Sequence, residues 1–296
     1  MGRYTGKALQ FLGLLLLFVI NQQNISAFYQ DNFQNDLADP APETYNNHAA
    51  SIDEHYANQL DSLDLRLYPG STYNQNSRST QGSLNHCKSL VFQTLTSLPK
   101  EHREYLQHLT LYFAEGRRGL GGGSTIILRC SDVDDAELSS VLVHEMGHIV
   151  DTGLKTGDSW SGKSEFKDGS IPIYNNDLSL RFYRISWLDD QTIKTEAVAQ
   201  DFVTGYAMTD PFEDFAESYN YYILHGKQFK EMAKYNVNLR RKFLYLKYFI
   251  FSGQEFDNDP SELPNFTMRR YDSTILGYNH EKFLRSNANR QEIATL

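Results

Sequence analysis

The chain has 296 residues, of which 40% are hydrophobic and 13% aromatic, enough apolar material for a globular core. This composition excludes a fibrous or wholly disordered protein. The net charge is −9, from 37 acidic and 28 basic residues. Proteins that bind nucleic acids use a basic surface to neutralise the backbone phosphates, so this negative net charge argues against a nucleic-acid partner.

The first 27 residues have the pattern of a secretory signal peptide. Two basic residues, Arg3 and Lys7, precede an apolar run at 8–20, and a polar stretch then ends at Ala27. The run is shorter than the roughly 20 residues that span a bilayer, so an uncleaved anchor is the weaker interpretation. No later segment is long and apolar enough to cross a membrane. We therefore expect an exported protein, either secreted or held in the cell envelope or periplasm, with no membrane span after signal cleavage.

The mature chain divides by composition into three parts. Residues 28–86 are rich in Asn, Gln, Ser, Asp and Tyr, which is typical of a largely disordered linker or pro-segment. Both a spacer and an inhibitory pro-segment fit this composition. Residues 87–256 contain the periodic apolar patterns of a folded domain, and residues 257–296 form a polar tail that we expect to be peripheral.

The two cysteines, Cys87 and Cys130, are predicted to form a disulfide, since export places them in an oxidising environment. Closing a loop of this length would contribute up to about 4 kcal/mol by the chain-entropy model. The alternative is that Cys87 is a removable metal ligand in a latent form. Its surroundings, Asn-His-Cys-Lys-Ser, carry no specific signature of such a switch.

The first part of the folded domain is expected to contain a helix at 88–98, ended by a proline, and a second helical stretch at 101–106. Two strands follow at 109–113 and 125–128, separated by the glycine-rich segment 117–124. This segment lacks the lysine of a phosphate loop and precedes a strand, so it is interpreted as a turn. If 125–128 is an edge strand, its unpaired backbone can bind an extended peptide.

A helix is predicted over 134–152, with Asp134 as its N-cap, Glu137 completing a capping box and Gly153 at its end. Within it lies His-Glu-Met-Gly-His, at 144–148. Two histidines four residues apart lie on one helix face and can bind a single metal ion, while the intervening glutamate can act on water bound to that ion.

A catalytic zinc site needs a third protein ligand and an open fourth position. The metzincin extension requires Gly and His where this chain has Asp151 and Leu154, so that class is excluded. A later helix, which begins at Pro211 after the N-cap Asp210 and ends near Gly226, offers two carboxylates on one face. These are Glu213 and Glu217, one as the ligand and the other supporting a histidine or the metal. Further helices are expected at 227–234 and 239–251.

Other third ligands stay open on spacing alone: Asp201 or Asp210 would fit a different zincin clan. The aromatic residues Phe182, Tyr183 and Trp187 lie in an irregular region at 154–198, and they either line substrate pockets or belong to the core.

The motif His-Glu-Met-Gly-His-Ile-Val-Asp, followed by Tyr-Ala-Met-Thr-Asp-Pro-Phe-Glu-Asp-Phe-Ala-Glu-Ser, resembles the catalytic core of gluzincins of the anthrax lethal factor and Pro-Pro endopeptidase type. The resemblance covers residues 116–225. It implies that Glu213 is the third zinc ligand, that Glu217 and Asp151 support the site, and that Tyr206 stabilises the oxyanion. The interval from His148 to Glu213 is longer than this family leads us to expect.

The predicted fold is α+β: a zincin-like domain in which a small mixed sheet, with an edge strand over the metal-binding helix, precedes a mostly helical C-terminal subdomain. The predicted function is a monomeric, zinc-dependent endopeptidase that binds one Zn²⁺ through His144, His148 and Glu213. Glu145 would be the general base acting on a peptide or protein substrate bound in extended form. The alternative is a binding or adhesion domain on a zincin fold that has lost its activity.

Overall fold

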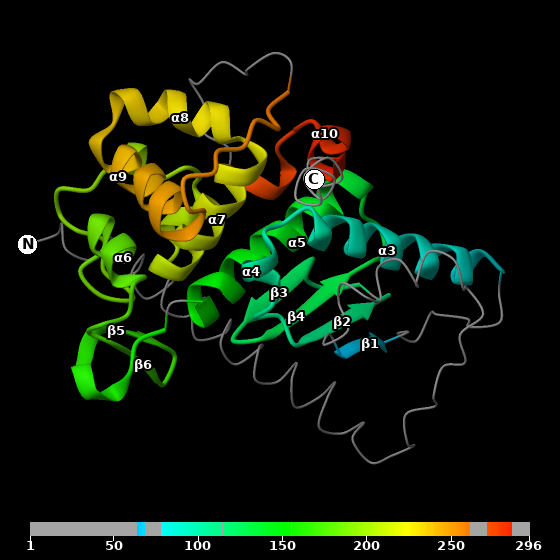
Figure 1. Cartoon of the computed structure of the whole chain (residues 1–296), viewed down its shortest axis with the longest axis horizontal. Helices are drawn as coiled ribbons and strands as arrows, with labels where there is room; N and C mark the ends of the chain where they lie inside the picture. The colour runs from blue at the N-terminus through cyan, green and yellow to red at the C-terminus, as the bar shows by residue number, and fades with distance from the viewer. Residues whose placement is uncertain (1–63, 69–77, 114, 155, 261–270, 286–296) are drawn as a thin grey trace, which may run out of the picture. The chain divides into compact units, whose positions relative to one another are not determined.

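The computed structural model describes residues 64–68, 78–260 apart from 114 and 155, and 271–285, all in the second of the chain's two units, Ser51–Leu296. The predicted signal peptide lies outside the described residues. The described part is α+β, with a small mixed sheet followed by a mainly helical region, as predicted from the sequence (Figure 1).

The main sheet has four strands in the order β1-β2-β4-β3. Strands β1 (Asp64–Tyr68), β2 (His108–Tyr112) and β4 (Thr125–Arg129) are parallel, while β3 (Gly119–Gly122) runs antiparallel to β4. The edge beside β4 is therefore occupied by the glycine-rich segment that was predicted to be a turn. The condition set for peptide binding at 125–128 is not met, because β4 is paired on both sides and is not an edge strand.

Helices α3 (Arg78–Thr96) and α5 (Asp135–Ile149) lie over one face of the sheet, with the short α4 (Lys100–Arg103) beside them (Figure 1). Helix α3 begins well before the predicted Lys88, so this helix and β1 extend regular structure into the range 28–86. The Cys87–Cys130 disulfide, predicted from the sequence, is present and joins α3 to the end of β4.

The region 154–198, predicted to be irregular, contains a two-stranded hairpin and a short helix. The hairpin is formed by β5 (Lys163–Asp168) and β6 (Ile171–Tyr174), and the helix is α6 (Leu180–Ser186). The candidate pocket aromatics of this region, Phe182, Tyr183 and Trp187, are at most 1% exposed. They belong to the hydrophobic core and not to a pocket wall.

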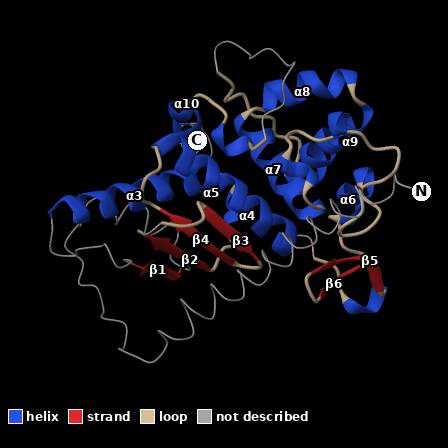
Figure 2. Cartoon of the chain, turned by 180° about the vertical axis from the view of Figure 1, so that it is seen from behind, coloured by secondary structure: helices blue, strands red, loops and turns tan. Residues whose placement is uncertain are grey.

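The C-terminal helices, shown from behind in Figure 2, are α7 (Pro211–Leu224), α8 (Gly226–Tyr235), α9 (Val237–Tyr245) and α10 (His280–Arg285). Short 3₁₀ turns cover 159–161, 199–201, 206–208 and 273–275, and single π-helical turns follow α5 at 150–154 and α9 at 246–250. Aromatic side chains fill the space between α7, α8 and α9. For example, the ring of Tyr222 in α7 has its centroid 6.5 Å from that of Phe229 in α8 and 5.1 Å from that of Phe243 in α9.

One buried ion pair fixes α9 against the start of α7. Lys242 and Asp214 are both fully buried, with Lys242 Nζ 2.6 Å from Asp214 Oδ2. The ammonium also donates to the Asp201 carbonyl at 2.9 Å and lies 4.1 Å from the centroid of the Phe202 ring. The indole of Trp187 donates to the same carboxylate, so both charges have polar partners, as burial requires.

Candidate metal centre

Local sequence signals place α5 and its two histidines. The carboxylate of Asp134 accepts a hydrogen bond from the Glu137 amide at 2.8 Å, which caps the helix as predicted. Within this helix His144 and His148 lie one turn apart, and the centroids of their rings are separated by 5.1 Å.

Helix α7 supplies the acidic partner. Asp210 accepts hydrogen bonds from the amides of Phe212 and Glu213, and Pro211 occupies the first helical position. The Glu213 carboxylate turns towards the two histidines of α5.

Close packing of two small residues brings α5 and α7 together at this point. A Cβ atom added at Gly147, between the two histidines, would lie 2.8 Å from Ala216 Cα. A side chain at this position would therefore separate the helices. The glycine of His-Glu-Met-Gly-His thus has a packing role that its position in the motif does not reveal.

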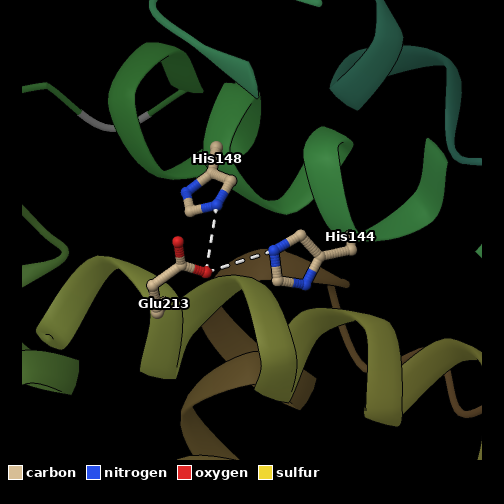
Figure 3. A group of neighbouring side chains, drawn as sticks. All are labelled: His144, His148 and Glu213. Atoms are coloured by element: carbon tan, nitrogen blue, oxygen red, sulfur yellow. Dashed lines mark ion pairs between the residues drawn. The ribbon is translucent and has the colours of Figure 1, made fainter. Parts of the chain in front are cut away.

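The three predicted ligands converge on one point (Figure 3). Glu213 Oε2 lies 3.2 Å from His144 Nε2 and 3.5 Å from His148 Nε2. One ligand atom from each residue lies within 4.8 Å of the other two, so the group can hold a metal ion. Glu213 Oε2 is buried and has no hydrogen-bond partner in the described part. A buried carboxylate oxygen facing two imidazole nitrogens fits a cation, and two nitrogens with one oxygen form a ligand set that zinc accepts.

The charges in this cluster are strongly coupled. Burial raises the pKa of Glu213, but the nearby His148 and His144 outweigh that effect and hold it below the usual range. The carboxylate is thus ionised and available as a ligand at neutral pH.

Glu217 lies behind His144 and outside the group of ligand atoms. Its Oε1 is 2.9 Å from His144 Nδ1, on the opposite side of the ring from Glu213. The carboxylate is fully buried and also accepts hydrogen bonds from the hydroxyl of Thr204 and from Ser273. Because Glu217 occupies Nδ1 of His144, Nε2 of the same ring is left to face the metal position. Sequence reasoning missed Thr204 and Ser273, because neither lies in a motif or a periodic segment.

Glu145, a residue of α5, is 6% exposed, and its side chain packs against the edge strand β3. Its carboxylate accepts a hydrogen bond from the Gly121 backbone, and burial raises its pKa even though His144 and His148 act in the opposite direction. Glycines allow β3 to approach this closely. A Cβ atom at Gly119 would lie 2.4 Å from Glu145 Oε1.

Tyr206 lies at the edge of the same cluster. Its hydroxyl donates to Glu213 Oε1 at 3.0 Å, while Glu213 Oε2 faces the histidines. Burial and the charge of Glu213 raise the pKa of Tyr206, so the phenol stays protonated at neutral pH and can act as a hydrogen-bond donor.

The remaining candidate residues lie away from the ligand group. Asp151 accepts a hydrogen bond from the Tyr183 hydroxyl at 2.6 Å, and burial raises its pKa to about 7. No hydrogen bond joins it to His148 in the described residues. Asp210 caps α7, and Asp201 accepts hydrogen bonds from the Val198 amide and a neighbouring asparagine. Neither of these two residues joins the group. With Cys87 in a disulfide, its thiol is not a metal ligand.

Comparison with known protein families, curated proteins and solved structures finds no match to this chain. None of the described helices has the length and apolarity needed to cross a membrane. The functional assignment therefore depends on the geometry of the site.

Proposed function

We propose that this protein is an exported zinc-dependent endopeptidase. The observation that carries the proposal is the position of Glu145 beside the His144, His148 and Glu213 group. A structural zinc site has four protein ligands and needs no base, whereas this group has three ligands and a buried carboxylate on the same helix. Such an arrangement favours hydrolysis over a binding domain with a purely structural metal.

His144, His148 and Glu213 would hold the zinc ion. When bound, zinc supplies a Lewis acid that makes water more acidic and polarises a carbonyl group. Glu145 accepts the proton of the attacking water and passes it to the nitrogen of the leaving amine. Its raised pKa helps the first of these transfers, because a more basic carboxylate accepts the proton of water more readily.

Tyr206 is proposed to stabilise the oxyanion. Its hydroxyl is already at the ligand group, and its protonated form is favoured by burial. A single donor of this kind typically contributes about 3 kcal/mol to transition-state stabilisation. The hydroxyl would turn from Glu213 Oε1 to the substrate when a peptide binds.

The substrate is proposed to bind as an extended peptide along β3, the edge strand, and not along β4, which pairs on both sides. Strand β3 is the sheet edge next to Glu145, so its outer backbone groups can pair with a peptide strand. The spacing of Tyr206, Glu213 and Glu217 also leads us to place the chain among the gluzincins of the anthrax lethal factor and Pro-Pro endopeptidase type.

The experiment compares the wild-type protein with Glu145→Gln on a peptide library, each with and without a chelator. Removing a general base should lower kcat/KM by about 100- to 10,000-fold. The variant should keep its zinc, because Glu145 is not a ligand. Cleavage at equal rates by both proteins, or cleavage unaffected by the chelator, would overturn the proposal. Ser186→Ala, which removes a buried hydroxyl of α6, is the matched control and should cleave like the wild type.

A further inference from the structure

A segment close to the C-terminal end of the described chain reaches into the metal centre. We call residues 271–275 the strap. The amide of Ser273 donates to Glu217 Oε2 at 2.9 Å, and the hydroxyl of the same residue donates to Glu217 Oε1 at 2.8 Å. Ser273 is fully buried. This part of the chain was expected to be a peripheral tail, and the contacts show that it is not peripheral.

Ser273 provides half of the contacts that fix the Glu217 carboxylate. The other two contacts are with the Thr204 hydroxyl at 2.5 Å and with His144 Nδ1 at 2.9 Å. Both oxygens of Glu217 are therefore fixed, one against Thr204 and Ser273 and the other against Ser273 and His144. A rotation of the carboxylate would break several of these contacts at once.

The strap is also attached to the proposed catalytic tyrosine. The amide of Tyr206 donates to the Tyr271 carbonyl at 2.6 Å, and the two rings lie with centroids 5.7 Å apart. Gly205 makes room for this contact, since a Cβ atom there would lie 3.2 Å from Tyr271 Cδ2.

A third attachment ties the strap to the sheet and α5. The guanidinium of Arg118, which precedes β3, donates to Thr274 Oγ1 at 2.7 Å and pairs with Asp272. The same group donates to Glu137 in the first turn of α5 at 2.9 Å. Arg118 therefore joins the strap to the helix that carries both histidines.

We propose that the strap is part of the metal centre and that Ser273 is a positioning residue, which orients His144 by fixing Glu217. This inference builds on the proposed zinc site and adds an element that no motif in the chain indicates. The strap determines how firmly the His144 ring is held, and through the Tyr271 carbonyl it determines where Tyr206 lies.

The test measures zinc affinity by competition with a chromogenic chelator, using the full mature chain. Ser273→Ala should bind zinc about tenfold more weakly, and Glu217→Gln about 10- to 100-fold more weakly. Because Ser273 acts through Glu217, the double variant should match Glu217→Gln within about twofold. Ser186→Ala is the matched control, because it truncates another buried serine, far from the strap in sequence and without a hydrogen-bond partner in the described part. It should bind zinc like the wild type.

A second pair of variants tests the strap without touching its buried serine. Arg118→Gln should weaken zinc binding several-fold, while Arg184→Gln, which removes an arginine paired with Glu165 at 2.6 Å, should not. Visible spectra of the cobalt-substituted proteins should change for Ser273→Ala and Arg118→Gln but not for the controls Ser186→Ala and Arg184→Gln, since these spectra report the geometry of the ligands.

The outcomes separate the two proposals. Additive losses in the double variant, or zinc affinity and cobalt spectra in Ser273→Ala and Arg118→Gln that equal those of the wild type, would overturn the strap inference alone. A wild-type protein that binds one zinc ion yet cleaves no peptide would overturn the proposed function and leave the strap inference standing. A wild-type protein that binds no zinc would overturn both.

Discussion

Replacing Gly119 by alanine tests how closely β3 is fitted to the proposed general base. The added methyl group would lie 2.4 Å from Glu145 Oε1 and 2.7 Å from Val141 Cγ1. Ordinary contacts between such atoms are about 3.5–4.0 Å, so the Glu145 carboxylate must move by about 1 Å. A displacement of about 1 Å at a reacting group can lower the rate by about 100-fold. Overpacking against Val141 should also reduce the free energy of unfolding by about 1–3 kcal/mol.

The assay measures kcat/KM on a fluorogenic peptide, together with zinc content and the free energy of unfolding in urea. Gly122→Ala is the matched control, because it adds the same methyl group to the same strand where no atom lies within 4 Å. Zinc content should be equal in both variants, since neither glycine touches a ligand. The reasoning is refuted if Gly119→Ala retains activity within about twofold of Gly122→Ala.

Three further predictions concern stability. Lys242→Met should lower the free energy of unfolding by about 3–5 kcal/mol, because it leaves the Asp214 carboxylate buried without its cation, and adding Asp214→Asn should recover part of this loss. Reducing the Cys87–Cys130 disulfide should lower the free energy of unfolding in urea by up to about 4 kcal/mol. An unchanged free energy of unfolding after reduction would contradict this prediction. Burial lowers the pKa of His225 to about 3. Below pH ~6.5 the unfolded chain therefore binds a proton that the folded chain excludes, and the free energy of unfolding decreases as the pH is lowered. His225→Gln should therefore lose about 2–3 kcal/mol less than the wild type between pH 7 and pH 4.5, and equal losses would refute this.

The parts of the site that the sequence predicted are those fixed by short-range signals. Asp134 with Glu137 marked the start of α5, and Asp210 marked the start of α7, because capping depends on residues three positions apart. The i,i+4 spacing then placed both histidines on one face. Chemistry predicted a further ligand, since two imidazoles of a zinc site require one, and the family resemblance then indicated Glu213 among the candidate carboxylates.

Long-range contacts between polar residues could not be predicted in this way. Ser273 binds Glu217 across 56 positions of the chain, and no periodicity marks a serine that completes a buried carboxylate. The glycine-rich segment misled for a different reason. Glycine has a low intrinsic preference for strands, yet Gly119 and Gly121 lie in β3, where a Cβ atom at either position would clash with Glu145.

The disulfide has a consequence for what happens when a protease cuts this chain. Residues 115–117, between β2 and β3, are exposed, and such turns are preferred sites of proteolytic nicking. Cys87 lies before this turn and Cys130 after it. A nicked chain would therefore remain one covalent molecule, with the fragment that carries α3 and β2 still attached to the end of β4.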